Sequence, residues 1–395
     1  MDNFFVQPVE KKVSAVAWWQ PQVPYSDGQL YFYSGTWDQG HANVLTLWTC
    51  PSPDIRSRQL DQNFEARIVA QTCHTGDVAD VLPLSNNMCA TASADGRVYV
   101  YHAPDTSASN GGGTSNESTL EKVQCISRLS SAKTSDIPSP ATSMMDLGNG
   151  SPAQPLITAK IYEAPCTALS LQPHCPHDPE LASVGEDGRL CLHRIGQSPE
   201  PMASVVADSL PLYDVAWLSS HTLMTAGRSG QLKVFDRRDC QQPMTVLVDP
   251  EDANLSVTCL AVHPSQANRI ATGNEFGNML IWDIRQLSEP YTNSVSINEK
   301  GFAINDLLFH PNQPFTVIAA SDDATCTIID TNACNPSAFN QNPLYQPTAA
   351  RTSTTGIRTL RNLYNWLGIN SLDYHPQANA LLAGSDSENL LYEFE

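Results

Sequence analysis

The sequence is poor in positive charge and has no long apolar run. It contains 22 lysines and arginines against 41 aspartates and glutamates, so its formal net charge is −19. Proteins bind nucleic acids and anionic membranes through clustered lysines and arginines, and no basic run here exceeds two residues. No apolar stretch approaches the roughly 20 residues that cross a bilayer, and residues 1–12 lack the basic and apolar regions of a secretory signal. We therefore expect neither direct nucleic-acid binding nor membrane insertion.

Motifs of catalysis and metal binding are also missing. The sequence has no GxSxG elbow, no GxxxxGK[ST] phosphate loop, and no HExxH or CxxC spacing. The 11 cysteines stand apart from one another, as the reduced thiols of a cytosolic or nuclear protein do. The sequence HCPH at 174–177 has no second ligand pair, and a plain turn is its simpler interpretation. We expect a non-enzymatic protein without catalytic residues, cofactor or metal.

A hairpin motif recurs along the chain. Residues 271–286, ATGNEFGNMLIWDIRQ, combine a strand of small residues, a tight turn and an alternating apolar strand. Asp-Gly between two alternating strands is a strong hairpin signal, because both turn residues adopt positive φ. Six further copies follow the same plan: YFYSGTWDQGHANVLTLWTC (31–50), NMCATASADGRVYVYHA (87–103), ELASVGEDGRLCLHRIG (180–196), TLMTAGRSGQLKVFDRR (222–238), TVIAASDDATCTIIDTN (316–332) and ALLAGSDSENLLYEFE (380–395). The chain therefore contains seven hairpins of one kind.

An additional alternating strand precedes each hairpin. These strands are KVSAVAWW (12–19), GDVADVLPL (76–84), PCTALSLQP (165–173), LYDVAWLS (212–219), SVTCLAVHP (256–264), AINDLLFHP (303–311) and GINSLDYHP (368–376). Three of them end in a His-Pro pair, at His263, His310 and His375. Proline ends a strand ladder because it has no N–H to donate. The regular placement of the histidines within a repeat indicates a turn or packing role rather than a ligand role.

The spacing of the turns indicates a propeller. The steps from Asp187 to Ser229, Phe276 and Asp323 are 42, 47 and 47 residues, near the roughly 40–45 residues of one propeller blade. The other intervals are longer, and their excess is rich in Ser, Thr, Gly and Pro, a composition that cannot bury a core. We therefore expect flexible loop insertions at 104–121 and 130–158 and a further insertion at 331–368, with KVQCISRL (122–129) as the outer strand of blade two.

The two ends of the sequence predict how the ring closes. The last repeat reaches Glu395 directly after its third strand, while NFFVQPVE (3–10) precedes the first strand of blade one. Lending this N-terminal strand to blade seven removes two open sheet edges. The prediction is an all-β fold: one seven-bladed propeller over residues 1–395, closed by its N-terminal strand.

A single segment has helical periodicity. In GIRTLRNLYNWLG (356–368) the apolar residues recur at helical steps between two glycines. We expect a short helix before the last blade, which either packs on the propeller or docks a partner helix with Trp366 as its anchor. The candidate partner-binding residues are Ile357, Leu360, Leu363, Tyr364 and Trp366.

The repeats resemble WD repeats. His74 precedes the first strand of blade two, and Asp95-Gly96 forms its turn. The tryptophan that closes a WD repeat is present as Trp48 and Trp282 and is replaced elsewhere, by Tyr101, His193, Phe235, Ile329 and Tyr392. The resemblance implies a hydrogen-bonded set of His, Ser or Thr, Asp and Trp in each blade, so the other five blades are expected to depend on packing.

Several phrases are also similar to one branch of this family, the small propeller nucleoporins of the outer-ring Y complex of the nuclear pore. They are SGTWD and LTLW in blade one, VGEDGRL, GQLKVFDRR, WDIRQ and NWLGINSLDYHP. This resemblance implies a scaffold at the nuclear pore complex of the nuclear envelope, bound to a helical-solenoid nucleoporin and other Y-complex subunits. It also implies support of pore assembly and of nucleocytoplasmic transport, mRNA included, and a kinetochore role in mitosis.

Two arginines support an alternative. FDRR and WDIR place Arg238 and Arg285 at the same point of successive repeats. A W-D-x-R ending on adjacent blades resembles the docking signature of cullin-4 ubiquitin-ligase substrate receptors, and a guanidinium suits a bidentate contact. The simpler interpretation is that each arginine pairs with a nearby acidic residue or closes a blade edge.

Overall fold

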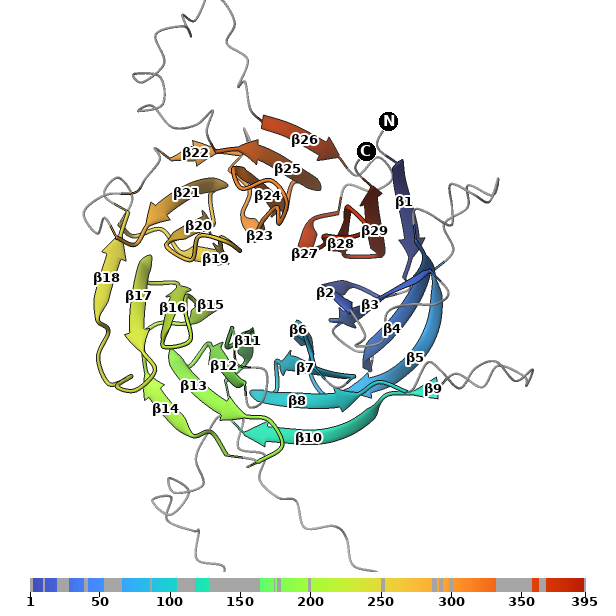
Figure 1. Ribbon diagram of the computed structural model, residues 1–395, viewed down its shortest axis with the longest axis horizontal. Helices are drawn as coiled ribbons and strands as arrows, with labels where there is room; N and C mark the ends of the chain where they lie inside the picture. The colour runs from blue at the N-terminus through green and yellow to red at the C-terminus, as the bar shows by residue number, and fades with distance from the viewer. Residues whose placement is uncertain are drawn as a thin grey trace, which may run out of the picture.

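Seven sheets surround a central axis in the computed structural model (Figure 1). Their strands pair antiparallel, apart from one short added strand in the first blade that pairs in parallel. The structure describes residues 3–9, 11–19, 28–38, 42–52, 66–85, 87–104, 118–127, 164–173, 175, 179–197, 200–249, 253–285, 290, 294–297, 301–331, 357–361 and 367–393. Six sheets have four strands and one has five. The predicted seven-bladed, all-β propeller is confirmed.

The strands of the first four blades are these. Blade one has β2 (Val13–Trp19), β3 (Gln29–Thr36), β4 (Asn43–Pro51), β5 (Arg67–His74) and the added β9 (Ser118–Thr119); blade two has β6 (Val78–Leu84), β7 (Met88–Ser93), β8 (Arg97–His102) and β10 (Glu121–Ser127). Blade three has β11 (Cys166–Leu171), β12 (Glu180–Gly185), β13 (Arg189–Arg194) and β14 (Ala203–Val206); blade four has β15 (Leu212–Trp217), β16 (Thr222–Gly227), β17 (Gln231–Asp236) and β18 (Thr245–Val248).

The last three blades follow the same order from the axis outward. Blade five has β19 (Val257–Val262), β20 (Arg269–Asn274), β21 (Asn278–Asp283) and β22 (Val295–Ser296); blade six has β23 (Ile304–Phe309), β24 (Thr316–Ser321), β25 (Thr325–Asp330) and β26 (Ile357–Arg361); blade seven has β27 (Ile369–His375), β28 (Ala380–Ser385), β29 (Glu388–Glu393) and β1 (Asn3–Pro8).

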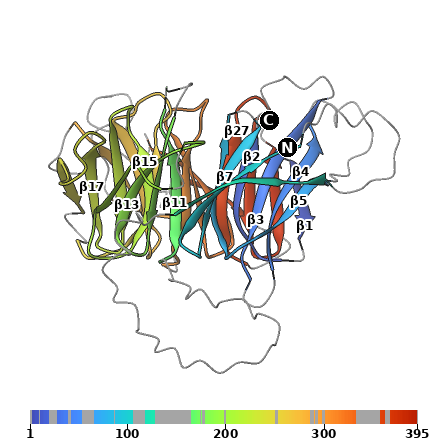
Figure 2. The same cartoon turned by 90° about the horizontal axis from the view of Figure 1, so that it is seen from below.

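The ring closes where the N-terminal strand meets the last repeat. β1 pairs antiparallel with β29 from Asn3 opposite Glu393 to Pro8 opposite Glu388. The two ends of the chain lie side by side at this blade in both views (Figures 1 and 2). The predicted closure is confirmed.

The tight turns between second and third strands require positive φ, as the Asp-Gly signal predicted. In blade three, Gly188 has a φ of 70°. A Cβ on this glycine would lie 2.2 Å from the carbonyl oxygen of Asp208, so the neighbouring chain leaves no room for a side chain here. The turn thus fixes both the hairpin and the path of the next connection.

The three His-Pro histidines cap the turns that follow the innermost strands. The Nδ1 atom of His263 accepts the backbone N–H groups of Ser265 and Gln266 at 3.1 and 3.0 Å. His310 accepts two N–H groups in the same way, and His375 accepts one. All three histidines are buried. The predicted turn role is confirmed.

The apolar core is divided among the junctions between blades. Seven clusters of buried side chains are found, and each combines residues from two neighbouring blades. The Trp18 cluster joins blades one and seven, for example, and the Tyr33 cluster joins blades one and two. Burial between sheets is therefore distributed evenly around the ring, and each blade depends on both neighbours.

Buried aspartates tie the innermost strands together. Asp80, Asp214 and Asp306 occupy the third position of the innermost strand in blades two, four and six. Each carboxylate accepts a backbone N–H from the innermost strand of the next blade, from Leu169 at 2.8 Å, Leu260 at 2.6 Å and Leu372 at 2.7 Å respectively. In blade seven, Asp373 accepts the N–H of Trp18 at 2.6 Å.

Hydroxyl and amide groups supply the remaining junctions. Ser14, Thr167, Thr258, Asn305 and Asn370 each occupy the second position of an innermost strand and donate to the first carbonyl of the next blade, that of Val78, Leu212, Ile304, Ile369 and Val13 respectively. Together with the aspartates, they place a side-chain to main-chain hydrogen bond at every one of the seven junctions. These bonds satisfy backbone groups that the sheets themselves leave unpaired.

The closing aromatic position varies in chemistry from blade to blade. The indole N–H of Trp48 donates to Ser34 at 2.8 Å, and that of Trp282 donates to Thr272 at 3.0 Å. His193 bonds Ser183 at 2.8 Å, so this histidine takes over the role of the tryptophan. Blade three thus lacks the full set of a WD repeat but keeps one of its hydrogen bonds, because an imidazole nitrogen can also bond the hydroxyl.

In blade four the same position leaves a hydroxyl without its partner. Phe235 replaces the tryptophan, and the fully buried Thr225 Oγ1 has no hydrogen-bond partner among the described residues. Thr225→Val is therefore expected to stabilise the protein by about 1 kcal/mol, because it removes an unsatisfied buried hydroxyl without changing side-chain shape. Thr272→Val in blade five should destabilise by a similar amount, since it orphans the indole N–H of Trp282. Urea unfolding of both variants tests this, and equal effects of the same sign would contradict it.

One predicted element is wrong. Residues 357–361 of the expected helix form strand β26, which pairs with β25 as the outer strand of blade six. No helix occurs in the part of the chain that the structure describes, and hence none there could span a bilayer. The outer strand predicted at 122–129 is confirmed as β10. Residues 105–117, 128–163 and 332–356, where insertions are predicted, lie outside the described residues.

Candidate protein-binding surfaces

Arg238 and Arg285 lie at matching points of blades four and five, just after β17 and β21. Each pairs with the aspartate two residues earlier, Arg238 with Asp236 at 2.6 Å and Arg285 with Asp283 at 2.5 Å. The Arg285 guanidinium is the main cause of the lowered pKa of Asp283. The arginine side chains nevertheless remain 70% and 66% exposed, so both guanidinium groups are presented to solvent on the same face of the ring.

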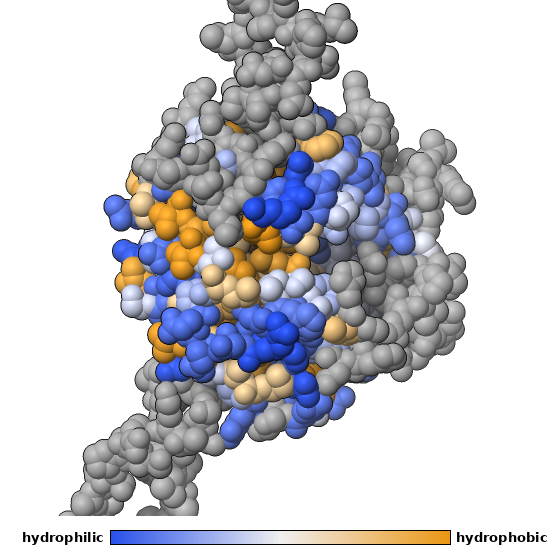
Figure 3. Space-filling model, turned by 60° about the vertical axis from the view of Figure 1, so that its left-hand side comes forward, coloured by the Kyte–Doolittle hydropathy of each residue, from blue (hydrophilic) through white to orange (hydrophobic). Residues whose placement is uncertain are grey.

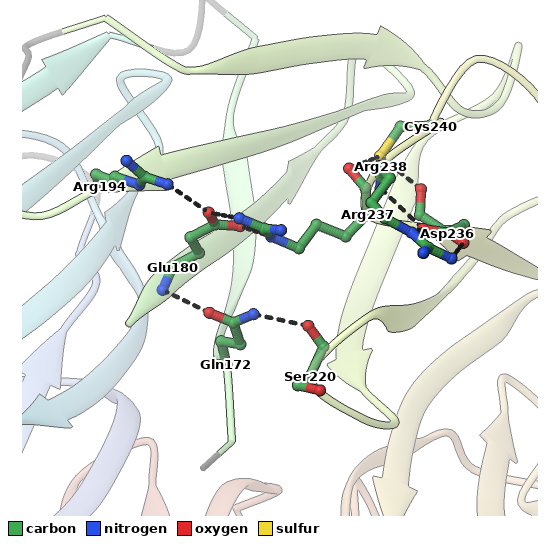
Figure 4. Close-up of polar contacts among 8 residues, drawn as sticks. All are labelled: Gln172, Glu180, Arg194, Ser220, Asp236, Arg237, Arg238 and Cys240. Carbon is green, nitrogen blue, oxygen red and sulfur yellow. Dashed lines mark hydrogen bonds and ion pairs between the residues drawn. The ribbon is translucent and has the colours of Figure 1, made fainter. Parts of the chain in front are cut away.

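The neighbouring Arg237 has a different role. It forms a bidentate ion pair with Glu180 of blade three, which also pairs with Arg194 at 3.3 Å (Figure 4). Glu180 is buried, and the hydrogen bond from Arg237 is the main cause of its lowered pKa. Gln172 continues the network, because it accepts the Glu180 backbone N–H and donates to the carbonyl of Ser220 in blade four. Of the two arginines in FDRR, therefore, the first joins blades and the second faces outward.

The residues predicted to bind a partner helix are only partly placed. Ile357 and Leu360 lie on β26, and each is partly buried. Ile357 packs against the cluster between blades five and six, whereas Leu360 packs against the cluster between blades six and seven. Leu363, Tyr364 and Trp366 lie outside the described residues. The structure thus gives the first two residues a packing role in the propeller.

An apolar surface covers part of the outer rim. Val246 and Val248 are alternate residues of β18, and Met244 directly precedes this strand. All three side chains are exposed. The side of the ring that carries blades four and five shows a gathering of apolar side chains (Figure 3). β18 is the outermost strand of its sheet, so one of its edges faces solvent.

In the described part of the chain, two cavities lie near the axis. One, of about 310 Å³, is lined by Pro264, Pro311 and Pro376 of the His-Pro turns together with apolar residues of the innermost strands. The other, of about 380 Å³, is lined by residues of blades one, two, three and seven, with Trp37 and Glu186 among them. Within the described residues, no group of three or more His, Cys, Asp or Glu side chains is placed to hold a metal ion.

The sequence interpretation missed the aspartates of the innermost strands. Burial raises the pKa of all four, of Asp306 to about 7 and of Asp373 to about 6. A signal was available: VADVLPL, LYDVAW and INDLLF each place one acidic residue at the third position of an otherwise mainly apolar strand. A charged residue that recurs in a buried strand indicates a conserved geometry within the repeat rather than a solvent-facing edge.

Comparison with known proteins finds similarity to a nucleoporin. No family model matches the chain. It is 27% identical over 283 residues to nucleoporin Nup43 of Homo sapiens, and equally to nucleoporin Nup43 of Mus musculus. The chain is a Nup43-like WD-repeat propeller. The alignment covers 70% of this chain but only 63% of either Nup43, so over a third of each relative has no aligned counterpart here.

The likeness to Nup43 agrees with the predicted resemblance to small propeller nucleoporins. The residues that carry the fold in this chain, the turn glycines and the tryptophan–hydroxyl pairs, belong to any WD-repeat propeller. The exposed residues, by contrast, are the ones through which one propeller differs from another. The candidate sites for partners are therefore the surface around Arg238 and Arg285, the surface around β18, and the two cavities near the axis.

Proposed function

We propose that this chain is a non-enzymatic scaffold subunit of the nuclear pore complex, located in the outer-ring Y complex at the nuclear envelope. Its partners are a helical-solenoid nucleoporin and other Y-complex subunits, and it contributes to pore assembly and to nucleocytoplasmic transport, mRNA included. In dividing cells it also reaches kinetochores. The observation that carries the proposal is the 27% identity to Nup43 over 283 residues in a chain that folds as a complete ring of blades.

The chemistry of the propeller supports a scaffold role. The buried aspartates of its innermost strands serve the junctions between blades, and the ionised side chains of the Arg237 network join blade three to blade four. A rigid ring with distributed junctions presents fixed surfaces to several partners at once, as an assembly subunit requires. The acidic net charge of −19 fits protein partners better than nucleic acid.

Affinity capture with the full chain tests the proposal. The tagged protein is incubated with nuclear-envelope extract, and the bound proteins are quantified by mass spectrometry against a tagged unrelated propeller. Helical-solenoid nucleoporins should be enriched. Recovery of no nucleoporin above the control propeller would refute the proposal, and fluorescence of the tagged chain away from the nuclear rim would do so independently.

The second candidate function is that of a substrate receptor for a cullin-4 ubiquitin ligase. The exposed guanidinium groups of Arg238 and Arg285 on adjacent blades favour it.

Arg238→Ala combined with Arg285→Ala separates the two functions. The double variant should keep most of its thermal stability, because both guanidinium groups are largely exposed and such pairs contribute about 0–1 kcal/mol. Asp236 and the buried Asp283 also keep the backbone N–H of residues 238 and 285 as a hydrogen-bond donor. Its capture of nucleoporins should be unchanged. If the second function exists, capture of a cullin adaptor is lost. Loss of nucleoporin capture instead would place these arginines in the scaffold interface.

A further inference from the structure

The turn of blade five carries a residue type that the other described turns do not. A tight turn joins the second and third strands of each blade. The residue directly before the positive-φ position of this turn is Asp95, Asp187, Ser229 and Asp323 in blades two, three, four and six. In each of these blades the side chain accepts the backbone N–H two residues on, at 3.0 to 3.4 Å. Blade five has Phe276 here, 51% exposed.

In blade five a different residue, Asn274, accepts the backbone N–H groups of the turn. The side-chain oxygen of Asn274 accepts the N–H groups of Phe276 at 3.0 Å and of Asn278 at 2.9 Å. The turn is therefore satisfied without a polar residue at position 276, and Gly277 retains its positive φ of 79°. An exposed phenylalanine contributes nothing to the hydrogen bonds of this turn that serine or aspartate does not supply.

A second exposed phenylalanine lies in a segment that passes the turn of blade five. A Cβ on Gly301 would lie 3.6 Å from the carbonyl oxygen of Phe276, and the N–H of Asp322 bonds the carbonyl of Ala303 at 3.2 Å. The segment 301–303 thus runs between the turns of blades five and six. Phe302, within it, is 41% exposed.

Acidic side chains flank the two rings. Glu275 precedes Phe276 in the turn of blade five, and Asp322 and Asp323 form the turn of blade six. Glu275 and Asp322 are exposed, and their hydrogen bonds to Ser256 and Asn305 involve neutral groups that leave the negative charges in place. A partner that covers the phenylalanines must therefore approach two or three carboxylates that have no ion pair among the described residues, which favours basic side chains on its rim.

We propose that Phe276 and Phe302 form a docking surface for a protein segment that inserts apolar side chains between blades five and six and pairs lysines or arginines with Glu275, Asp322 and Asp323. This inference rests on the proposed scaffold function in one respect, namely that the chain binds a protein partner. The two phenylalanines supply the apolar anchor, as buried aromatic residues do at interface centres. The carboxylates select the sign of charge around it.

Selection from a phage-displayed library of random 16-residue peptides tests the proposal. The full chain serves as bait, and the chain with Phe276→Ser and Phe302→Ser serves for counter-selection. Serine occupies the turn position of blade four that is equivalent to 276, so Phe276→Ser should keep the turn. The melting temperature of the double variant checks that Phe302→Ser leaves the fold intact. Phe315→Ser, which removes an exposed phenylalanine at the opposite end of the strands of blade six, is the matched control.

The selected peptides should be enriched in apolar residues together with lysine or arginine and depleted in aspartate and glutamate. Their affinity for the chain should fall tenfold or more in the double variant, stay unchanged in Phe315→Ser and weaken with rising salt. Peptides that are acidic, or that bind the double variant as well as the parent chain, would overturn the inference. So would a selection that yields no binder of the parent chain. None of these outcomes bears on nucleoporin capture, which tests the scaffold function separately.

Discussion

Deletion of residues 2–9 should lower the free energy of unfolding by on the order of 5 kcal/mol and expose the chain to aggregation. The deletion removes the six-residue ladder between β1 and β29. It also uncovers the apolar clusters that Phe5 and Val6 help to close, one on each side of blade seven. The estimate combines the lost burial of two large side chains with the lost strand hydrogen bonds. The freed edge of β29 then becomes a template for pairing with another chain.

Thermal unfolding and light scattering of the purified deletion variant measure both effects. The variant Pro8→Ala, which changes an exposed residue of the same strand, is the control and should behave as the parent chain. A synthetic peptide of residues 1–11 added in excess should restore part of the lost stability, because a ligand that binds only the folded form stabilises it by RT ln(1 + [L]/Kd). An unchanged melting temperature on deletion would show that β1 does not close the ring.

The hairpins could be predicted because their signals are local. Gly188, for instance, follows an aspartate between two alternating strands, and only residues of that hairpin decide its conformation. Closure by the N-terminal strand could also be predicted. The last repeat has only three strands, and the strand at the N-terminus belongs to no other blade, so pairing the two completes the last blade. The seven-bladed architecture follows from counting such units.

The segment 357–361 shows where local pattern fails. A three-residue step between Ile357 and Leu360 puts two side chains on one face of a helix but on opposite faces of a strand. The structure uses the second arrangement, since Ile357 and Leu360 pack against different clusters on either side of blade six. Both faces of a propeller blade are buried, so the apolar pattern alone does not distinguish the two. The pairing of this segment with β25, remote in sequence, makes the choice.

The interblade hydrogen bonds could not be predicted for a related reason. Asp80 bonds Leu169, 89 residues later, and Asp373 bonds Trp18, 355 residues earlier. No local rule connects such partners. The acidic residue inside a buried strand was visible in the sequence, but its acceptor role depends on the angle between neighbouring blades.

Replacement of Asp306 by asparagine should remove a large part of the pH dependence of stability. Burial is the main cause of the raised pKa of Asp306, about 7 against an ordinary 3.8, and the N–H groups of Leu372 and Leu307 oppose it. The carboxylates of Asp80 and Asp373 raise it further. A raised folded-state pKa gives stability that is complete below about pH 4 and is lost as pH rises through 7. For one group this change is on the order of 4 kcal/mol.

Other groups titrate with the opposite sign, so the variant must be compared with the parent chain at each pH. Burial lowers the pKa of His74, His310 and His375, and stability from these groups is lost as pH falls below about 6.5. Their contribution is common to both proteins and cancels in the difference.

Asparagine is neutral at every pH, so the stability of the parent chain relative to Asp306→Asn should fall by about 4 kcal/mol between pH 4 and pH 8. Urea unfolding across this range provides the measurement. Asp330→Asn, which alters an exposed aspartate at the end of β25 in the same blade, is the matched control for the loss of one aspartate. Parallel profiles for the parent chain and Asp306→Asn would mean that Asp306 does not take up a proton on folding. The innermost strands of blades six and seven would then be joined by a fully ionised carboxylate at neutral pH, held by its two backbone N–H donors alone.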